Sequence, residues 1–258
     1  MVYRFLLTRR WLGLLAVAVV VAASCVLLGR WQLHRLEYKH HRNELVSRNI
    51  AATPVLPGRL LRVDRGPDAA DQWRRVRTTG RYDPDHTLLV RNRPLDGQIG
   101  FHVLVPFVTA AGPALLVDRG WIPAGENATV VPDVPRPPPG EVAVTVRLRP
   151  SEPASTTGTP PRGQVTRIDV STIRQDLPYP TYGGYGELTR EEPRPRDAPA
   201  RLDLPELSTG PHLAYAVQWF LFALMALGAF VVLARREAAD RRAAAAGAAP
   251  VVSVRVSG

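Results

Sequence analysis

The sequence predicts a membrane protein of the α+β class, in which two transmembrane helices flank an extracytoplasmic, antiparallel β-rich domain. Three observations support this prediction. An apolar block lies near each end of the 258-residue chain. The polar middle contains short runs of strand-forming residues separated by turn residues, a pattern typical of a sheet. Arginines flank both apolar blocks, as basic residues do at the cytoplasmic ends of membrane helices.

The first predicted membrane helix covers residues 11–29. Residues 11–28 carry no charge, and about 20 apolar residues cross the ~30 Å hydrocarbon layer of a bilayer. A cleaved leader is the alternative, because Ala22-Ala23-Ser24-Cys25 resembles a lipoprotein cleavage site. The apolar run continues through Leu28 and leads into a helix-like segment at residues 31–46. This continuity favours a retained anchor.

The second predicted membrane helix covers residues 212–233 and is followed by four arginines. Residues 1–10 and residues 234–258 are both short and basic, so we expect both termini in the cytoplasm and the chain in the cell membrane. Residues 30–211 then form the extracytoplasmic β-rich domain. The Ala-rich, basic tail at 234–258 is expected to be disordered.

Between the helices, strand-like runs alternate with turns that contain proline or glycine. Val142, Val144, Val146 and Leu148 occupy alternate positions, which is typical of a half-buried strand. The spacing of the runs predicts consecutive antiparallel hairpins, with a short helix near residues 170–176. The predicted strands are residues 75–82, 87–92, 100–109, 114–122, 141–149, 164–169 and 182–189.

Composition and motifs exclude several classes of function. The net charge of +10 does not indicate nucleic-acid binding, because the basic residues are scattered and no stacking aromatics accompany them. The single cysteine, Cys25, excludes an intrachain disulfide and a CxxC or CxxCH motif. The sequence contains no P-loop, GxSxG or HExxH motif, so we expect a protein that is not an enzyme. His102 lies in an apolar strand and is expected to be a hydrogen-bonded core residue.

Histidine, aromatic and arginine side chains gather where the two membrane helices meet the outer interface. Since the two helices run antiparallel, the residues at the end of the first helix and at the start of the second lie at the same depth in the membrane, on its outer side. An imidazole, flat apolar walls and arginines are what a haem requires. By residue type alone, an interfacial aromatic belt with snorkelling arginines explains them better. The residues recur every three or four positions and so share a helix face: Trp31, Arg35 and Tyr38 on the first helix, and His212, Tyr215, Trp219 and Phe222 on the second.

Four blocks of sequence follow one another along the chain: LGRWQLHRL at 28–36, VRNRPLDG with GFHVLVP at 90–97 and 100–106, LVDRGWIP at 116–123, and HL, YA and WF between 212 and 220. Together they resemble the Surfeit-locus-one (Shy-one) family of cytochrome c oxidase assembly factors. The third block contains Arg119, and the match spans nearly the whole chain. Family members usually carry asparagine before the histidine of the last block, where this chain has Gly210-Pro211.

The resemblance implies that the chain assists the delivery or insertion of haem a into subunit I of an aa3-type cytochrome c oxidase. It implies transient binding of haem a, with subunit I and haem a synthase as partners beside the membrane lipid. His212 corresponds to a histidine that is implicated in haem binding in bacterial members, and it is the expected ligand of the haem iron. Tyr215, Trp219, Trp31 and Arg35 are the other expected haem-binding residues. A membrane-anchored scaffold that holds oxidase intermediates without haem is the alternative.

Overall fold

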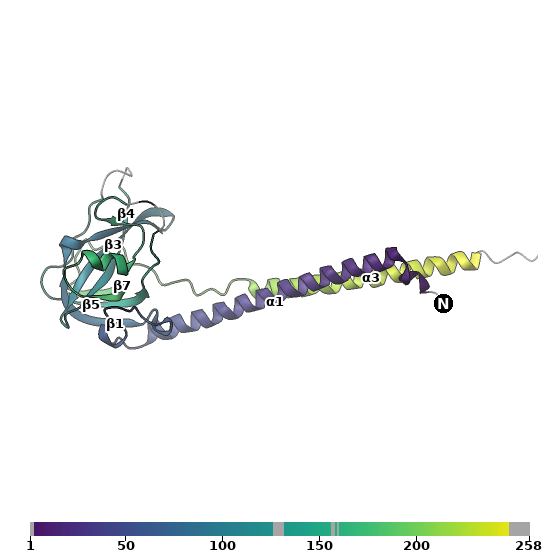
Figure 1. The fold of residues 1–258 in the computed structure, drawn as a ribbon, viewed down its shortest axis with the longest axis horizontal. Helices are drawn as coiled ribbons and strands as arrows, with labels where there is room; N and C mark the ends of the chain where they lie inside the picture. The colour runs from purple at the N-terminus through teal and green to yellow at the C-terminus, as the bar shows by residue number, and fades with distance from the viewer. Residues whose placement is uncertain (1–2, 126–131, 156–157, 159, 248–258) are drawn as a thin grey trace, which may run out of the picture. The chain divides into compact units, whose positions relative to one another are not determined.

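The computed structural model describes residues 3–125, 132–155, 158 and 160–247. The chain forms two compact units. The helical unit comprises residues 1–42 and 207–258, and the β-domain comprises residues 43–206. Long helices build the first unit and a seven-stranded sheet builds the second (Figure 1), so the α+β class predicted from the sequence is confirmed.

Two long helices lie near the chain termini. Helix α1 spans Arg9–Ala51, after a 3-10 turn at Arg4–Leu7, and helix α3 spans His212–Gly247. The 43 residues of α1 correspond to a length of about 65 Å. Both helices are long and apolar enough to cross a membrane, and most of each apolar stretch is exposed rather than packed inside the protein. Exposed apolar helices of this length are consistent with membrane anchoring.

Both helices extend beyond the predicted membrane spans. The prediction of disorder from residue 234 is wrong for residues 234–247, which continue α3. Alanine has the highest helix propensity of all residues, and the Arg241 guanidinium lies 2.8 Å from the Glu237 carboxylate one turn away. Residues 248–258 of the predicted tail lie outside the described residues. Helix α1 extends to residue 51, so the first part of the predicted β-rich domain at 30–211 is helical.

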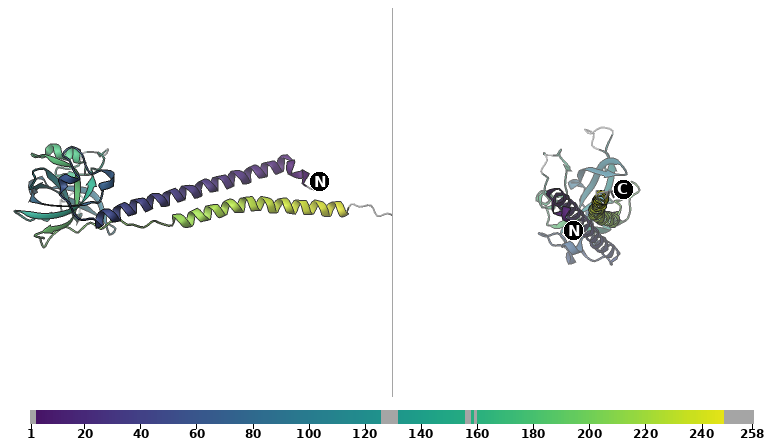
Figure 2. Two further views of the ribbon diagram at one scale, coloured as in Figure 1. Left: turned by 90° about the horizontal axis from the view of Figure 1, so that it is seen from below. Right: turned by 90° about the vertical axis from the view of Figure 1, so that its right-hand side faces the viewer.

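Helices α1 and α3 run side by side in opposite directions (Figure 2), and small residues make their contact. Ala22, Cys25 and Ala223 are buried together. A Cβ atom added to Gly29 would lie 2.8 Å from the ring of Phe220. Small residues allow two membrane helices to approach closely and pack without an aqueous hydrophobic effect. The buried position of Cys25 agrees with its expected role as a small apolar residue.

The β-domain is a mixed sheet with the strand order β1-β5-β7-β4-β3-β2-β6. Because β1 also pairs with β3, strands β1, β5, β7, β4 and β3 close into a barrel, and β2 and β6 extend from β3. A short helix, α2, and several 3-10 turns connect the strands. The bounds are β1 Arg75–Tyr82, β2 Leu88–Leu95, β3 Gln98–Thr109, β4 Ala114–Pro123, β5 Val142–Pro150, β6 Gln164–Val165, α2 Val170–Ile173 and β7 Thr181–Glu192.

The prediction of a purely antiparallel sheet is wrong at two places. Strand β7 pairs with β4 in parallel, with Asp118 opposite Glu187. Strand β6 pairs with β2 in parallel, with Leu89 opposite Gln164. Parallel pairing requires a long connection between the strands, and the chain between β4 and β7 provides one, because it contains β5, β6 and α2.

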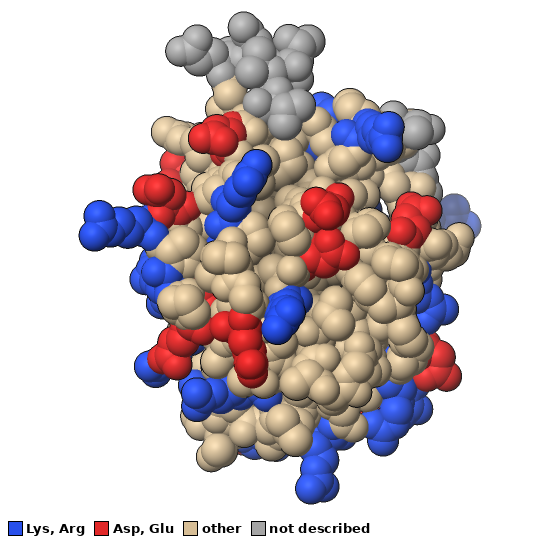
Figure 3. Space-filling model, turned by 90° about the vertical axis from the view of Figure 1, so that its left-hand side faces the viewer, with Lys and Arg blue, Asp and Glu red and all other residues tan. Residues whose placement is uncertain are grey.

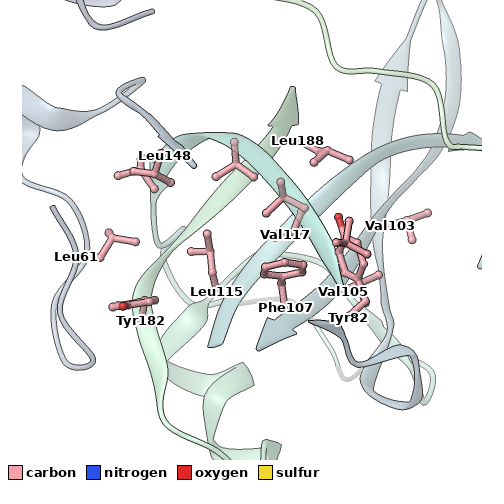
Figure 4. Close-up of a cluster of buried hydrophobic side chains, with 14 of the residues drawn as sticks. Leu61, Tyr82, Val103, Val105, Phe107, Leu115, Val117, Leu148, Tyr182 and Leu188 are labelled. Carbon is pink, nitrogen blue, oxygen red and sulfur yellow. The ribbon is translucent and has the colours of Figure 1, made fainter. Parts of the chain in front are cut away.

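The barrel interior is filled by aliphatic and aromatic side chains, several of which are labelled in Figure 4. Val103, Leu104 and Val105 are all fully buried, which confirms that both faces of this strand are covered. Val103 and Val105 belong to the interior cluster. Leu104 belongs to a second cluster on the outer face, together with Val170 and Ile173 of α2.

Arg119, which matches the family signature, lies inside the barrel. It follows Val117 by two positions on β4 and so shares its face of the strand, and its side chain has no exposed surface. One guanidinium nitrogen donates to the Pro135 carbonyl (2.9 Å), and another lies 3.4 Å from the Glu191 carboxylate. The guanidinium also faces the ring of Tyr82 at 5.3 Å. This signature residue is therefore part of the interior of the β-domain.

Asp118, the neighbour of Arg119, lies on the opposite face of β4. Its carboxylate accepts a hydrogen bond from His102 Nδ1 at 2.7 Å and another from the Gly120 backbone at 3.2 Å. The predicted hydrogen bonding of His102 is confirmed, and its side chain is partly buried. On the domain face shown in Figure 3, arginine and acidic side chains lie among one another and do not gather by sign.

Candidate functional site

The candidate site lies in the helical unit, where α3 begins. Pro211 comes directly before the helix, where its missing N–H leaves no hydrogen bond unmade. The Pro211 carbonyl accepts the backbone N–H of Tyr215 at 3.1 Å, and this bond closes the first turn. Gly210 has a φ of +69°, a left-handed conformation that glycine adopts without strain. His212 is the first helical residue as a result.

The imidazole of His212 is held by a residue of the other helix. Its Nδ1 lies 2.8 Å from the Oε1 atom of Gln32 on α1. The two residues are 180 positions apart in the sequence, and the antiparallel packing of α1 and α3 brings them to the same level. The side chain of His212 is half-buried, and the described residues provide no hydrogen-bond partner for its Nε2 atom.

Gln32 was not among the predicted site residues. It lies inside the LGRWQLHRL block, next to Trp31, in the first polar turn after the apolar run. The signal that could have identified it is its position just beyond the apolar run of α1. At that level of the membrane, the antiparallel partner helix α3 begins with His212.

Of the predicted aromatic residues, Trp219 is the one that α3 turns toward α1. It packs against the buried cluster of Ala22, Cys25 and Ala223. Its ring meets that of Phe222 edge to face, with centroids 5.8 Å apart. This pair provides a fixed apolar surface on the helix that carries His212, within two turns of it.

Tyr215, Trp31 and Arg35 are largely exposed on the two helices. The exposed fractions are 48% for Tyr215 and 58% for Trp31. The Arg35 guanidinium faces the ring of Tyr38 at 5.8 Å. Among the described residues, no hydrogen bond or ring contact joins these three side chains to His212. They are available to a ligand but do not form a preassembled pocket with the histidine.

The described residues contain no group of three or more His, Cys, Asp or Glu side chains that could hold a free metal ion. A single imidazole whose second nitrogen has no partner in the described part of the chain could instead bind the iron of a haem. In a haem the porphyrin supplies the equatorial nitrogens, so the protein needs to provide only axial ligands.

The chain is similar in sequence to known proteins. The SURF1 family model matches residues 19–224, which include most of α1 and the first part of α3. Proteins named "Uncharacterized SURF1-like protein" from Mycobacterium bovis and Mycobacterium tuberculosis are 35% identical over 253 residues, covering 95% of this chain and 91% of theirs. A "SURF1-like protein" from Dictyostelium discoideum is 26% identical over 99 residues, covering 36% of this chain and 37% of its own. The chain belongs to the SURF1 family.

Proposed function

We propose that this chain is an assembly factor for an aa3-type cytochrome c oxidase, and that it carries haem a to subunit I. In this proposal haem a is a transient cargo, and the chain is not an enzyme. The observation that carries the proposal is the imidazole of His212, whose Nδ1 is bound to Gln32 and whose Nε2 has no partner among the described residues. Membership of the SURF1 family supports the same function.

The residues present fit a haem. His212 would provide the axial nitrogen. Trp219, Tyr215 and Trp31 would provide apolar contacts to the faces and edges of the macrocycle. Arg35, which is exposed on α1, would neutralise a propionate through charge-assisted hydrogen bonds.

The proposal includes a membrane topology. Both termini would lie in the cytoplasm, and the β-domain would lie on the outer side of the cell membrane, as the basic termini suggest. Subunit I and haem a synthase would then meet the chain at the outer ends of α1 and α3. Reporter fusions that place the two termini on opposite sides of the membrane would contradict this topology and the haem site together.

The test is an absorption spectrum of the full-length protein, purified in detergent from cells that synthesise haem a. The wild type should retain haem, and His212→Ala should lose most of it. His34→Ala is the matched control, because His34 is an exposed histidine on α1, two residues from Gln32; it should retain the wild-type haem content. Equal haem in all three proteins would refute His212 as the ligand. Oxidase subunits that co-purify with a haem-free wild type would favour the scaffold function instead.

A further inference from the structure

The hydrogen bond between Gln32 and His212 joins the two membrane helices at the candidate site. We propose that Gln32 is a positioning residue, which fixes the tautomer and the ring orientation of His212. The inference concerns the histidine itself, and its use for haem depends on the function proposed above.

The chemistry of the two groups sets the direction of the hydrogen bond. The Gln32 Oε1 atom lies 2.8 Å from Nδ1, and an amide oxygen can only accept a hydrogen bond. In the neutral imidazole one ring nitrogen carries the proton and the other carries the lone pair. With the Gln32 amide oriented so that its oxygen faces the ring, the proton resides on Nδ1 and the lone pair resides on Nε2. A metal binds the nitrogen with the lone pair, so this tautomer presents Nε2 to a ligand.

The hydrogen bond also limits rotation of the ring. His212 belongs to α3 and Gln32 belongs to α1, so the bond ties the imidazole to a second rigid element. Histidines that bind metals commonly donate their other N–H to a carbonyl or carboxylate, which fixes the ring and the tautomer. An amide fulfils this role without a charge, which suits a site at the edge of the hydrocarbon layer, where charged groups are costly.

Gln32 also has a consequence for how the site is assembled. The hydrogen bond that favours the Nδ1–H tautomer forms when α1 and α3 are packed together, because neither helix contains both partners. The close contact of Gly29 with Phe220, one turn from Gln32 along α1, supports the same packing. The pairing of the helices and the readiness of the imidazole are therefore coupled.

The test measures the tautomer in the full-length protein without haem. The protein is labelled with ¹⁵N-histidine and placed in nanodiscs, at a pH where the ring is neutral, and the His212 signals are assigned by their loss in His212→Ala. The wild type should show mainly the Nδ1–H form. Gln32→Leu should lower the ratio of Nδ1–H to Nε2–H by roughly two- to tenfold, the effect that the net contribution of one hydrogen bond supports.

Two further variants separate positioning from general structural damage. Gln32→Glu keeps an oxygen acceptor at the same place and should retain the Nδ1–H form. Gln218→Leu removes an exposed amide from α3 and should leave the ratio unchanged. A wild type in the Nε2–H form, or a ratio that Gln32→Leu does not change, would overturn the inference.

A second measurement distinguishes this inference from the proposed function. If His212 holds haem, Gln32→Leu should weaken haem retention by roughly 10- to 100-fold, as loss of a partner to a ligating histidine typically does, and Gln32→Glu should restore it. If the tautomer responds to Gln32 but no protein in the series retains haem, the proposed function fails and the role of Gln32 stands.

Discussion

The buried ion pair inside the barrel offers a quantitative test of how the β-domain is stabilised. Glu191→Leu removes the carboxylate that faces Arg119 at 3.4 Å. The Arg119 side chain has no exposed surface and that of Glu191 has 3%. Without Glu191, the guanidinium keeps the Pro135 carbonyl as an acceptor but loses its counter-charge in a site that water does not reach.

The size of the effect follows from this burial. Removal of one partner from a buried pair typically costs about 3–5 kcal/mol, because the other charge stays buried and unpaired. Glu192, the next residue of β7, provides the matched control. It pairs with Arg190 and Arg77 at the surface, and its side chain is 47% exposed. Glu192→Leu should cost no more than about 1 kcal/mol, the usual contribution of an exposed pair.

Hydrogen exchange of β4 and β7 amides in the full-length protein measures the free energy of opening for each variant. The double variant Arg119→Met/Glu191→Leu should be about 2–3 kcal/mol more stable than the sum of the single effects predicts, because it leaves no unpaired charge. If Glu191→Leu costs no more than Glu192→Leu, or if the single effects add, the pair does not stabilise the barrel as described.

Two further predictions concern one residue in each unit. Gly29→Leu should separate α1 from α3, because a Cβ atom at this position would lie 2.8 Å from the Phe220 ring. Gly13→Leu is the control and should not separate them, because no atom lies within 4 Å of a Cβ atom added there. Cross-linking of a cysteine pair placed across α1 and α3 measures the separation, and equal cross-linking in the two variants would contradict the prediction. The Glu152 carboxylate is partly buried, which raises its pKa, but hydrogen bonds from Arg93 and a backbone N–H outweigh this effect and hold the pKa below 4.5. The stability it contributes is present above pH 4.5 and is lost as the pH falls through the lowered pKa. Urea titrations at several pH values should therefore show a flatter acid limb for Glu152→Gln, and an unchanged limb would refute this assignment.

Local patterns predicted most elements of the β-domain, and long-range pairing is where they failed. Alternation along residues 142–148 indicated β5, and its valines do face the barrel core. No local pattern shows that β7 inserts between β5 and β4, because period-two alternation specifies a strand but not its neighbour. The helical end of α3 at residues 234–247 was missed for a different reason. Its composition of alanines and charges predicts disorder, although alanine has the highest helix propensity and the segment directly follows a helix.

The candidate site also contains residues that local sequence predicts and one residue that only long-range packing identifies. His212 could be predicted from the sequence blocks, and its depth followed from the antiparallel order of the helices. Gln32 could not, because its role depends on a single contact between residues 180 positions apart. The spacing of Tyr215 and Trp219 predicts that they share one face of α3. In the structure, however, only Trp219 packs against α1, and Tyr215 is exposed.

The position of β7 in the barrel bears on how the chain is made. During synthesis, β1, β3, β4 and β5 emerge long before Thr181, and the pairings among them leave one side of β4 and one side of β5 without a partner. Both open edges are bridged only when residues 181–192 arrive. A nascent or truncated chain that stops short of this strand exposes two templates for intermolecular pairing. Loss of β7 would therefore produce an aggregation-prone chain and not a smaller folded domain.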